Sequence, residues 1–148
     1  MLIIITCILV GMTAAVHTLG IAFLLLKLKS WNAHAVARFW PIFRMLIGIT
    51  WWLVLIHLVE ISVWAVFYWW VECLPNIEDA LYFSGVTYAT IGYGDIVLER
   101  PWRILTAVEG LTGVLMCGLS AGVFFAVVNH IYRLYYQQAE DLPDAPND

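Results

Sequence analysis

Residues 77–95 read IEDALYFSGVTYATIGYGD, a stretch with helical character that runs directly into a glycine-rich segment. Asn76 can cap a helix here, and Glu78 and Asp79 would complement the helix dipole in its first turn. We therefore predict a helix over residues 77–88. It is too short to cross a bilayer, which takes about 20 residues, and suits an element that enters the membrane halfway.

The glycine-rich segment, TIGYGD at residues 90–95, follows this helix directly. Its alternating glycines permit backbone angles that other residues avoid, so consecutive carbonyl groups can all point the same way. Irregular backbone at membrane depth is tolerated only where it is buried in protein or lines water. A row of carbonyl groups repeated by symmetry can replace the water shell of a small monovalent cation. This segment is the candidate ion-binding site.

The chain as a whole has the composition of a membrane protein. Of its 148 residues, 63% are hydrophobic and 12% are charged, about half the charge of a soluble domain, which excludes a soluble monomer and a disordered chain. Three apolar runs, residues 1–26, 45–71 and 104–131, are each long enough to span the bilayer. Because residues 1–26 lack the positive start and short apolar core of a signal peptide, we expect a retained helix.

Cysteine spacing and net charge exclude several other classes. Cys7, Cys73 and Cys117 are widely spaced, with no CxxC motif and no Cys/His cluster, so neither a zinc site nor a disulfide framework is indicated. The net charge of −4 argues against nucleic-acid binding. The sequence shows no nucleophile–base pair of a membrane enzyme, and we expect no catalytic residue and no cofactor.

The distribution of Lys and Arg predicts the orientation. The connector, residues 27–44, has four basic residues and no acidic ones, so we place it in the cytoplasm, in part as an amphipathic helix on the membrane surface. The N-terminus and residues 72–103 are then outside. The acidic tail, residues 133–148, is cytoplasmic and expected to be disordered after a frayed helix. The outer segment has a net charge of −3, which would concentrate cations there.

TIGYGD, preceded by ALYFSGVTYA and flanked by apolar spans, resembles the pore domain of the potassium channel family. The resemblance to small bacterial two-helix channels implies an outer helix (45–71), a pore helix (77–88), a filter (90–95) and an inner helix (103–131). Residues 1–44, an additional N-terminal helix and the connector, precede this pore domain (45–132), and the acidic tail, residues 133–148, follows it. It implies an all-α membrane protein. Each subunit would have three transmembrane helices, a re-entrant pore helix and an extended selectivity filter, and would assemble as a homotetramer.

The resemblance also implies roles within the filter. Potassium would be bound only by the backbone carbonyl groups of Thr90, Ile91, Gly92 and Tyr93 and by the Thr90 hydroxyl group, with Gly94 and Asp95 shaping the outer mouth. Ile91 replaces the commoner valine, and the Tyr93 ring would pack against the pore helix.

One position behind the filter departs from the family. Some relatives have an acidic residue where this chain has Val86, so Asp95 lacks that partner. Tyr82 is a candidate substitute donor.

The inner helix has a candidate gating hinge at Gly113, where the family often has a glycine; close helix packing is the alternative. Helical spacing places four candidate pore-lining residues on one face, with core packing as the alternative for each: Val114, Cys117, Ala121 and Phe125. Phe125 is also a candidate constriction.

Ionisable side chains inside the spans are functional candidates. His57 and Glu60 share a helix face and are interpreted as a structural pair, with a pH sensor as the alternative. We expect Glu109 to hydrogen-bond to the region of the pore helix. His17 and His130 show no pattern that indicates a role.

These features together predict a potassium-selective channel, a multi-pass protein of the cell membrane with its N-terminus outside and its C-terminus cytoplasmic. Its partners would be lipids and K⁺ ions. The alternatives are a weakly selective cation channel, against which Tyr93 and Gly94 argue, and a non-conducting subunit that modulates a partner. No span has arginine at every third position and no soluble domain follows the inner helix, so we expect neither a voltage sensor nor a ligand-binding cytoplasmic domain.

Overall fold

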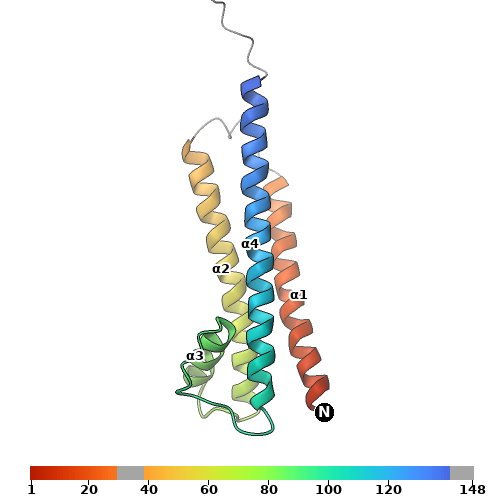
Figure 1. Ribbon diagram of the computed structural model, residues 1–148, viewed down its shortest axis with the longest axis vertical. Coiled ribbons are helices and arrows are strands. Elements are labelled where there is room, and N and C mark those ends of the chain that lie inside the picture. Colours follow the sequence, from red (N-terminus) through yellow and green to blue (C-terminus); the bar gives the residue numbers. More distant parts are fainter. Residues whose placement is uncertain (30–38, 141–148) are drawn as a thin grey trace, which may run out of the picture.

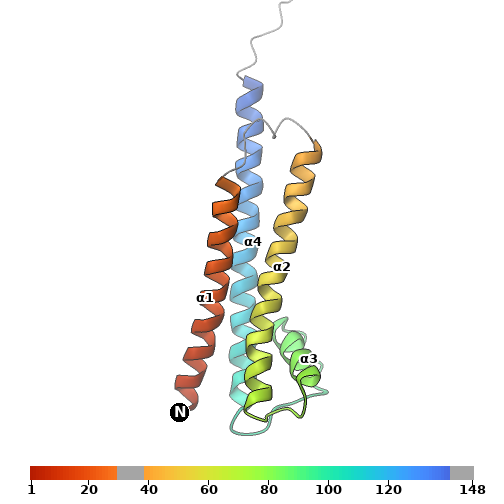
Figure 2. The same cartoon turned by 180° about the vertical axis from the view of Figure 1, so that it is seen from behind.

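The computed structural model describes residues 1–29 and 39–140, which form a bundle of helices (Figure 1). The helices are α1 (Leu2–Lys29), α2 (Phe39–Trp70), α3 (Ile77–Tyr88) and α4 (Arg103–Glu140). α1, α2 and α4 are long and lie side by side, whereas α3 is short and lies at the end of the bundle where the chain begins (Figures 1 and 2). No strand occurs in the described residues, as the predicted all-α class requires.

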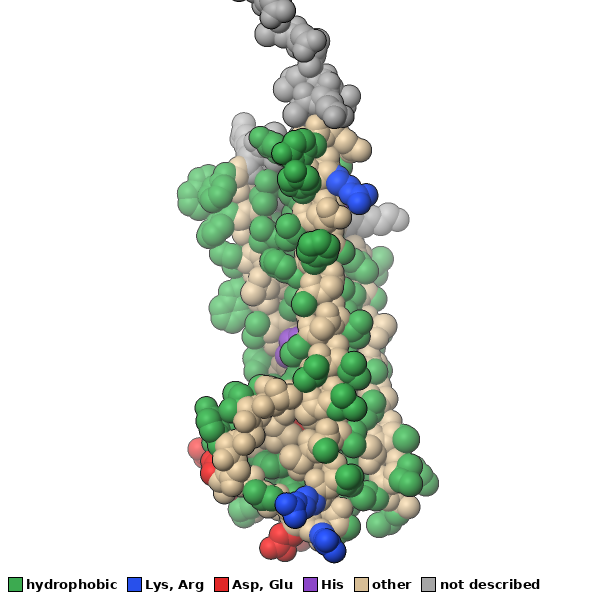
Figure 3. Space-filling view, in the orientation of Figure 1, with side chains coloured by type: hydrophobic (Ala, Val, Ile, Leu, Met, Phe, Trp, Pro, Cys, Tyr) green, Lys and Arg blue, Asp and Glu red, His purple; other side chains and the backbone are tan. Residues whose placement is uncertain are grey.

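α1, α2 and α4 are each long and apolar enough to cross a membrane. Their outward-facing side chains are largely apolar, and Figure 3 shows charged side chains gathered toward the two ends of the molecule. Large exposed apolar residues occur on all three helices, among them Ile3, Leu19, Leu55, Leu58, Leu111 and Leu119. Such a surface is favourable in lipid and costly in water, so the chain is a multi-pass membrane protein.

All three long helices extend beyond their predicted bounds, and α1 ends at Lys29 rather than at residue 26. α2 begins at Phe39 rather than at residue 45, and Pro41 is tolerated in its first turn because its missing N–H group costs no hydrogen bond there. α4 continues to Glu140 rather than ending at residue 131, so the first part of the predicted tail is helical. α3 occupies the same residues as the predicted short helix. The middle of the connector and the end of the tail lie outside the described residues.

α3 begins as its sequence suggests. The side chain of Asn76 accepts a hydrogen bond from the backbone N–H group of Asp79 at 2.8 Å, and Glu78 and Asp79 lie in the first turn. The cap satisfies a backbone donor that would otherwise have no partner, and the two acidic residues complement the positive end of the helix dipole.

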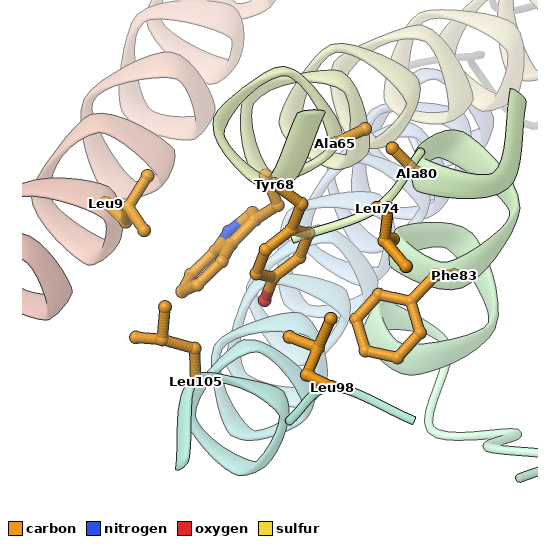
Figure 4. Packing of buried hydrophobic residues seen from close by; sticks show 9 residues of the cluster. Leu9, Ala65, Tyr68, Leu74, Ala80, Phe83, Leu98 and Leu105 are labelled. Atoms are coloured by element: carbon orange, nitrogen blue, oxygen red, sulfur yellow. The ribbon is translucent and has the colours of Figure 1, made fainter. Parts of the chain in front are cut away.

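The larger apolar core holds α3 and the chain that follows it against α2 and α4 (Figure 4). The rings of Tyr68 and Phe83 meet edge to face with their centroids 5.4 Å apart. The buried residues of this core are Leu9, Trp64, Ala65, Tyr68, Leu74, Ala80, Phe83, Leu98 and Leu105. This packing fixes the position of α3 beside the glycine-rich segment.

α1 is held against α2 by polar as well as apolar contacts. The indole N–H group of Trp64 donates to Thr13 Oγ1 at 3.0 Å, and that of Trp52 donates to the carbonyl oxygen of Gly20 at 2.9 Å. A Cβ atom at Gly20 would lie 2.5 Å from the side chain of Ile56, so glycine permits the close approach of the two helices. α1 is therefore a packed element of the subunit.

Candidate functional site: a filter segment at the end of α3

The backbone of residues 90–95, here called the filter segment, alternates in handedness. Thr90, Gly92 and Gly94 have positive φ angles of 58°, 52° and 78°. Left-handed backbone is disfavoured for a non-glycine residue such as Thr90, which makes its occurrence here informative. Alternation between left- and right-handed residues turns successive peptide groups to the same side, as the glycine spacing predicts.

The start of the filter segment is fixed to the C-terminal end of α3. The N–H groups of Ile91 and Gly92 donate to the carbonyl oxygen of Val86 at 2.8 and 3.1 Å, and the N–H group of Thr90 donates to that of Thr87 at 2.9 Å. The first three N–H groups of the filter segment are thus bound to the helix that precedes it.

The filter segment is exposed along its whole length in the single chain. The side chains of Ile91 and Tyr93 are 54% and 70% exposed. We expected the Tyr93 ring to pack against the pore helix, but its exposure shows that its own α3 covers little of it.

The outer end of the filter segment is joined to the middle of α3. The hydroxyl group of Tyr82 donates a hydrogen bond to Asp95 Oδ2 at 2.7 Å. This bond holds the pKa of Asp95 below its ordinary value and raises the pKa of Tyr82, because it favours the ionised carboxylate and the protonated phenol. Tyr82, the candidate donor, is therefore the hydrogen-bond partner of Asp95.

Glu109 of α4 connects the inner helix to α2 and α3. Its side chain is fully buried and accepts hydrogen bonds from the hydroxyl groups of Tyr68, at 2.8 Å, and Ser84. The predicted contact with the pore-helix region is therefore present. Tyr68 and Ser84 are partners that the sequence reading missed, because neither has a distinguishing spacing.

Gly113 lies where α4 passes closest to the end of α3. A Cβ atom at this position would lie 2.1 Å from the carbonyl oxygen of Tyr88, and one at Gly110 would lie 3.4 Å from that of Thr87. The absence of a side chain at Gly113 is thus required by close helix packing. Close packing was the alternative to a gating hinge at this position. The role of Gly113 as a gating hinge stays a prediction.

A family model described as an ion channel matches residues 56–130, which include the C-terminal part of α2, all of α3, the filter segment and most of α4. The chain belongs to this ion channel family. The match covers half of the chain and agrees with the pore-domain resemblance of the sequence. Comparisons with curated proteins and with solved structures give no match.

The candidate pore-lining residues of the channel are exposed on α4 in the single chain. Val114 and Phe125 are 54% and 71% exposed, and Cys117 and Ala121 are exposed as well. Leucines on other sides of α4, such as Leu119, are exposed to a similar degree, so exposure alone does not distinguish a pore face. That Val114, Cys117, Ala121 and Phe125 line the pore stays a prediction.

A second buried polar group lies between the channel's helices, toward the middle of the bundle. His57 Nδ1 is 3.1 Å from Glu60 Oε2, which confirms the predicted pair. His17 Nδ1 lies 2.9 Å from Glu60 Oε1, so His17, to which the sequence reading gave no role, is the second partner of this carboxylate. His17 lies on the same helix face as Thr13 and Gly20, through which α1 contacts α2, but nothing in the sequence of α1 marks this face as the packed one.

Proposed function

We propose that the channel is a potassium-selective homotetramer in which residues 90–95 form the selectivity filter. The observation that carries the proposal is the alternating backbone at Thr90, Gly92 and Gly94, directly after a short helix inside a three-span subunit. K⁺ ions would pass down their electrochemical gradient, without a catalytic step and without a cofactor.

Neutral carbonyl oxygens suit a cation that has lost its water shell. The carbonyl groups of Thr90, Ile91, Gly92 and Tyr93, with the Thr90 hydroxyl group, would supply the successive binding positions. The C-terminal end of α3 carries partial negative charge and would favour a cation in the space below the filter.

The proposed fourfold assembly follows from the small number of oxygen ligands that one chain can place around an ion. A single filter segment presents its carbonyl groups from one side only, whereas replacing a water shell takes oxygens all around the ion. Four copies around one axis would close the site and cover the exposed filter segments and part of the exposed face of α4.

The charges at the two ends of the subunit support the proposed orientation. The end with the filter segment carries five acidic residues and two basic ones between residues 72 and 103, which would attract cations to an outer mouth at Gly94 and Asp95. The opposite end carries Lys27, Arg44 and Arg133, as expected for a cytoplasmic face.

Flux measurements on the purified protein in liposomes test the proposal. We expect K⁺ uptake that exceeds Na⁺ uptake and is blocked by barium. Gly92→Ala should abolish it, because alanine in left-handed backbone costs about 1–2 kcal/mol in each subunit. Gly11→Ala, on the exposed side of α1 with open space at its Cβ position, is the matched control.

Each other outcome overturns part of the proposal. Equal K⁺ and Na⁺ uptake would identify a weakly selective cation channel. No uptake at all would favour a non-conducting subunit that modulates a partner. Unchanged uptake in the Gly92→Ala variant would contradict the assignment of the filter.

A further inference from the structure

A group of ligand-bearing side chains converges where α1, α2 and α3 meet. Glu60 of α2 is fully buried and lies between His17 of α1, at 2.9 Å, and His57 of α2, at 3.1 Å. The hydroxyl group of Tyr88, the last residue of α3, donates to Glu60 Oε2 and lies 3.0 Å from His57 Nδ1. Two imidazole nitrogens, a carboxylate and a phenol oxygen therefore face one another.

The spacing of these atoms suits a metal ion. One ligand atom from each of His17, His57 and Glu60 lies within 4.8 Å of the other two. A tetrahedral zinc ion with bonds of about 2.0–2.1 Å holds its ligands roughly 3.3 Å apart. Small side-chain movements from the present separations of 2.9 and 3.1 Å would therefore admit the ion.

Several polar groups converge on the Glu60 carboxylate in this cluster. The Nε2 atom of His17 is buried and has no hydrogen-bond partner among the described residues, although the ring is only 1% exposed. The hydroxyl group of Tyr88 and Nδ1 of His57 also both approach the same carboxylate oxygen. Nδ1 of His17, Nδ1 of His57 and the hydroxyl group of Tyr88 thus crowd around one carboxylate, and these are the groups that can bind a cation, whereas Nε2 of His17 lies on the other side of the ring.

We propose that His17, His57 and Glu60 form a binding site for a divalent transition metal ion of the zinc type. Imidazole nitrogen and carboxylate oxygen are common zinc ligands, and three protein ligands leave a fourth position for a water molecule or the oxygen of Tyr88. Binding through Nδ1 places the ring proton of each histidine on Nε2. In His57 that proton points to Ser120 Oγ at 3.0 Å, an outer partner that fixes the ring.

The site joins the added N-terminal helix to the part of the chain that the family model covers. His17 lies outside the matched residues 56–130, whereas His57 and Glu60 lie within them. His57 is 19% exposed, so the site is not fully closed to an ion from outside the subunit. The proposal adds a metal site to a chain in which sequence spacing indicated none besides K⁺, and it is independent of ion conduction.

Equilibrium dialysis of the full, untagged chain against Zn²⁺ in detergent tests the site. We expect one Zn²⁺ per subunit and, with Co²⁺ as a probe, the visible absorption bands of a tetrahedral site. His17→Gln and Glu60→Gln should each weaken binding by more than about a hundredfold, and Ser120→Ala by about tenfold. His130→Gln, at an exposed position of α4, should leave binding unchanged.

The proposal fails if the wild-type chain takes up no stoichiometric Zn²⁺ and gives no Co²⁺ bands. It also fails if His17→Gln and His57→Gln bind Zn²⁺ as the wild type does. Far-ultraviolet circular dichroism identifies any variant that has lost its helices. Because the Co²⁺ spectrum is measured on the unaltered chain, a variant that does not fold leaves the test intact.

Discussion

Tyr82 in the middle of α3 donates a hydrogen bond of 2.7 Å to Asp95 at the outer end of the filter segment. The start of the same segment is bound to the end of α3 through the carbonyl oxygen of Val86. The segment is thus attached to one helix at both of its ends, which limits how far it can move as ions pass.

Tyr82→Phe removes the hydroxyl group that bonds to Asp95 and keeps the aromatic ring. We expect the pKa of Asp95 to rise toward its ordinary value, because the hydrogen bond from Tyr82 is the main cause of its lowering. Carbon-13 NMR of the labelled carboxyl group measures this shift. Tyr135→Phe, at the other end of the molecule, is the control; a shift of equal size there would show that the effect is not local.

The lowered pKa of Asp95 also predicts a pH dependence. The carboxylate and its hydrogen bond are fully present above the ordinary aspartate pKa and are lost as the pH falls through the lowered one. K⁺ conductance should therefore be insensitive to outer pH from neutral to mildly acidic values, and Tyr82→Phe should move its decline to higher pH. Identical titration curves for the two proteins would contradict this.

Gly113→Ala places a methyl group 2.1 Å from the carbonyl oxygen of Tyr88. Because the obstacle is backbone at the base of the filter, we expect the end of α3 to shift, a loss of stability of about 1–3 kcal/mol and a loss of K⁺ flux. Thermal unfolding and liposome flux measure the two effects. Gly118→Ala, with open space at its Cβ position in the same helix, should be tolerated; equal behaviour of the two variants would refute the packing role of Gly113.

Glu109→Gln tests the link between α4 and the pore helix. The carboxylate accepts from both Tyr68 and Ser84, whereas an amide offers one acceptor and turns a donor toward the other hydroxyl group. We expect a loss of stability of about 1–3 kcal/mol, seen as a lower unfolding midpoint. Glu99→Gln, at an exposed position, should not change the midpoint. A midpoint for Glu109→Gln equal to that of the wild type would show that these hydrogen bonds do not stabilise the subunit.

Local signals made several features predictable from the sequence. The cap at Asn76 and the acidic first turn located α3, and alternating glycines indicated the unusual backbone of the filter segment. The partner of Asp95 followed from the absence of an acidic residue at Val86 and the presence of Tyr82 one turn earlier. In each case, the residues that interact lie within one short stretch of chain.

Contacts between distant helices were not predictable in this way. His17 and Glu60 are 43 positions apart, and which faces of α1 and α2 meet is decided by packing, such as the close approach at Gly20. The same holds for Tyr68 and Glu109. The periodicity of apolar residues can show which face of a helix packs against its neighbours. The spans in α1 and α4 are apolar all round, so their sequences do not show which face is packed.

We propose above that residues 90–95 select K⁺ over Na⁺. The most direct test of this selectivity is the reversal potential of currents through the purified protein in a planar bilayer, with K⁺ on one side and Na⁺ on the other. The account predicts a reversal potential displaced strongly toward the K⁺ equilibrium potential. A reversal potential near zero, with currents carried equally by both ions, would contradict it.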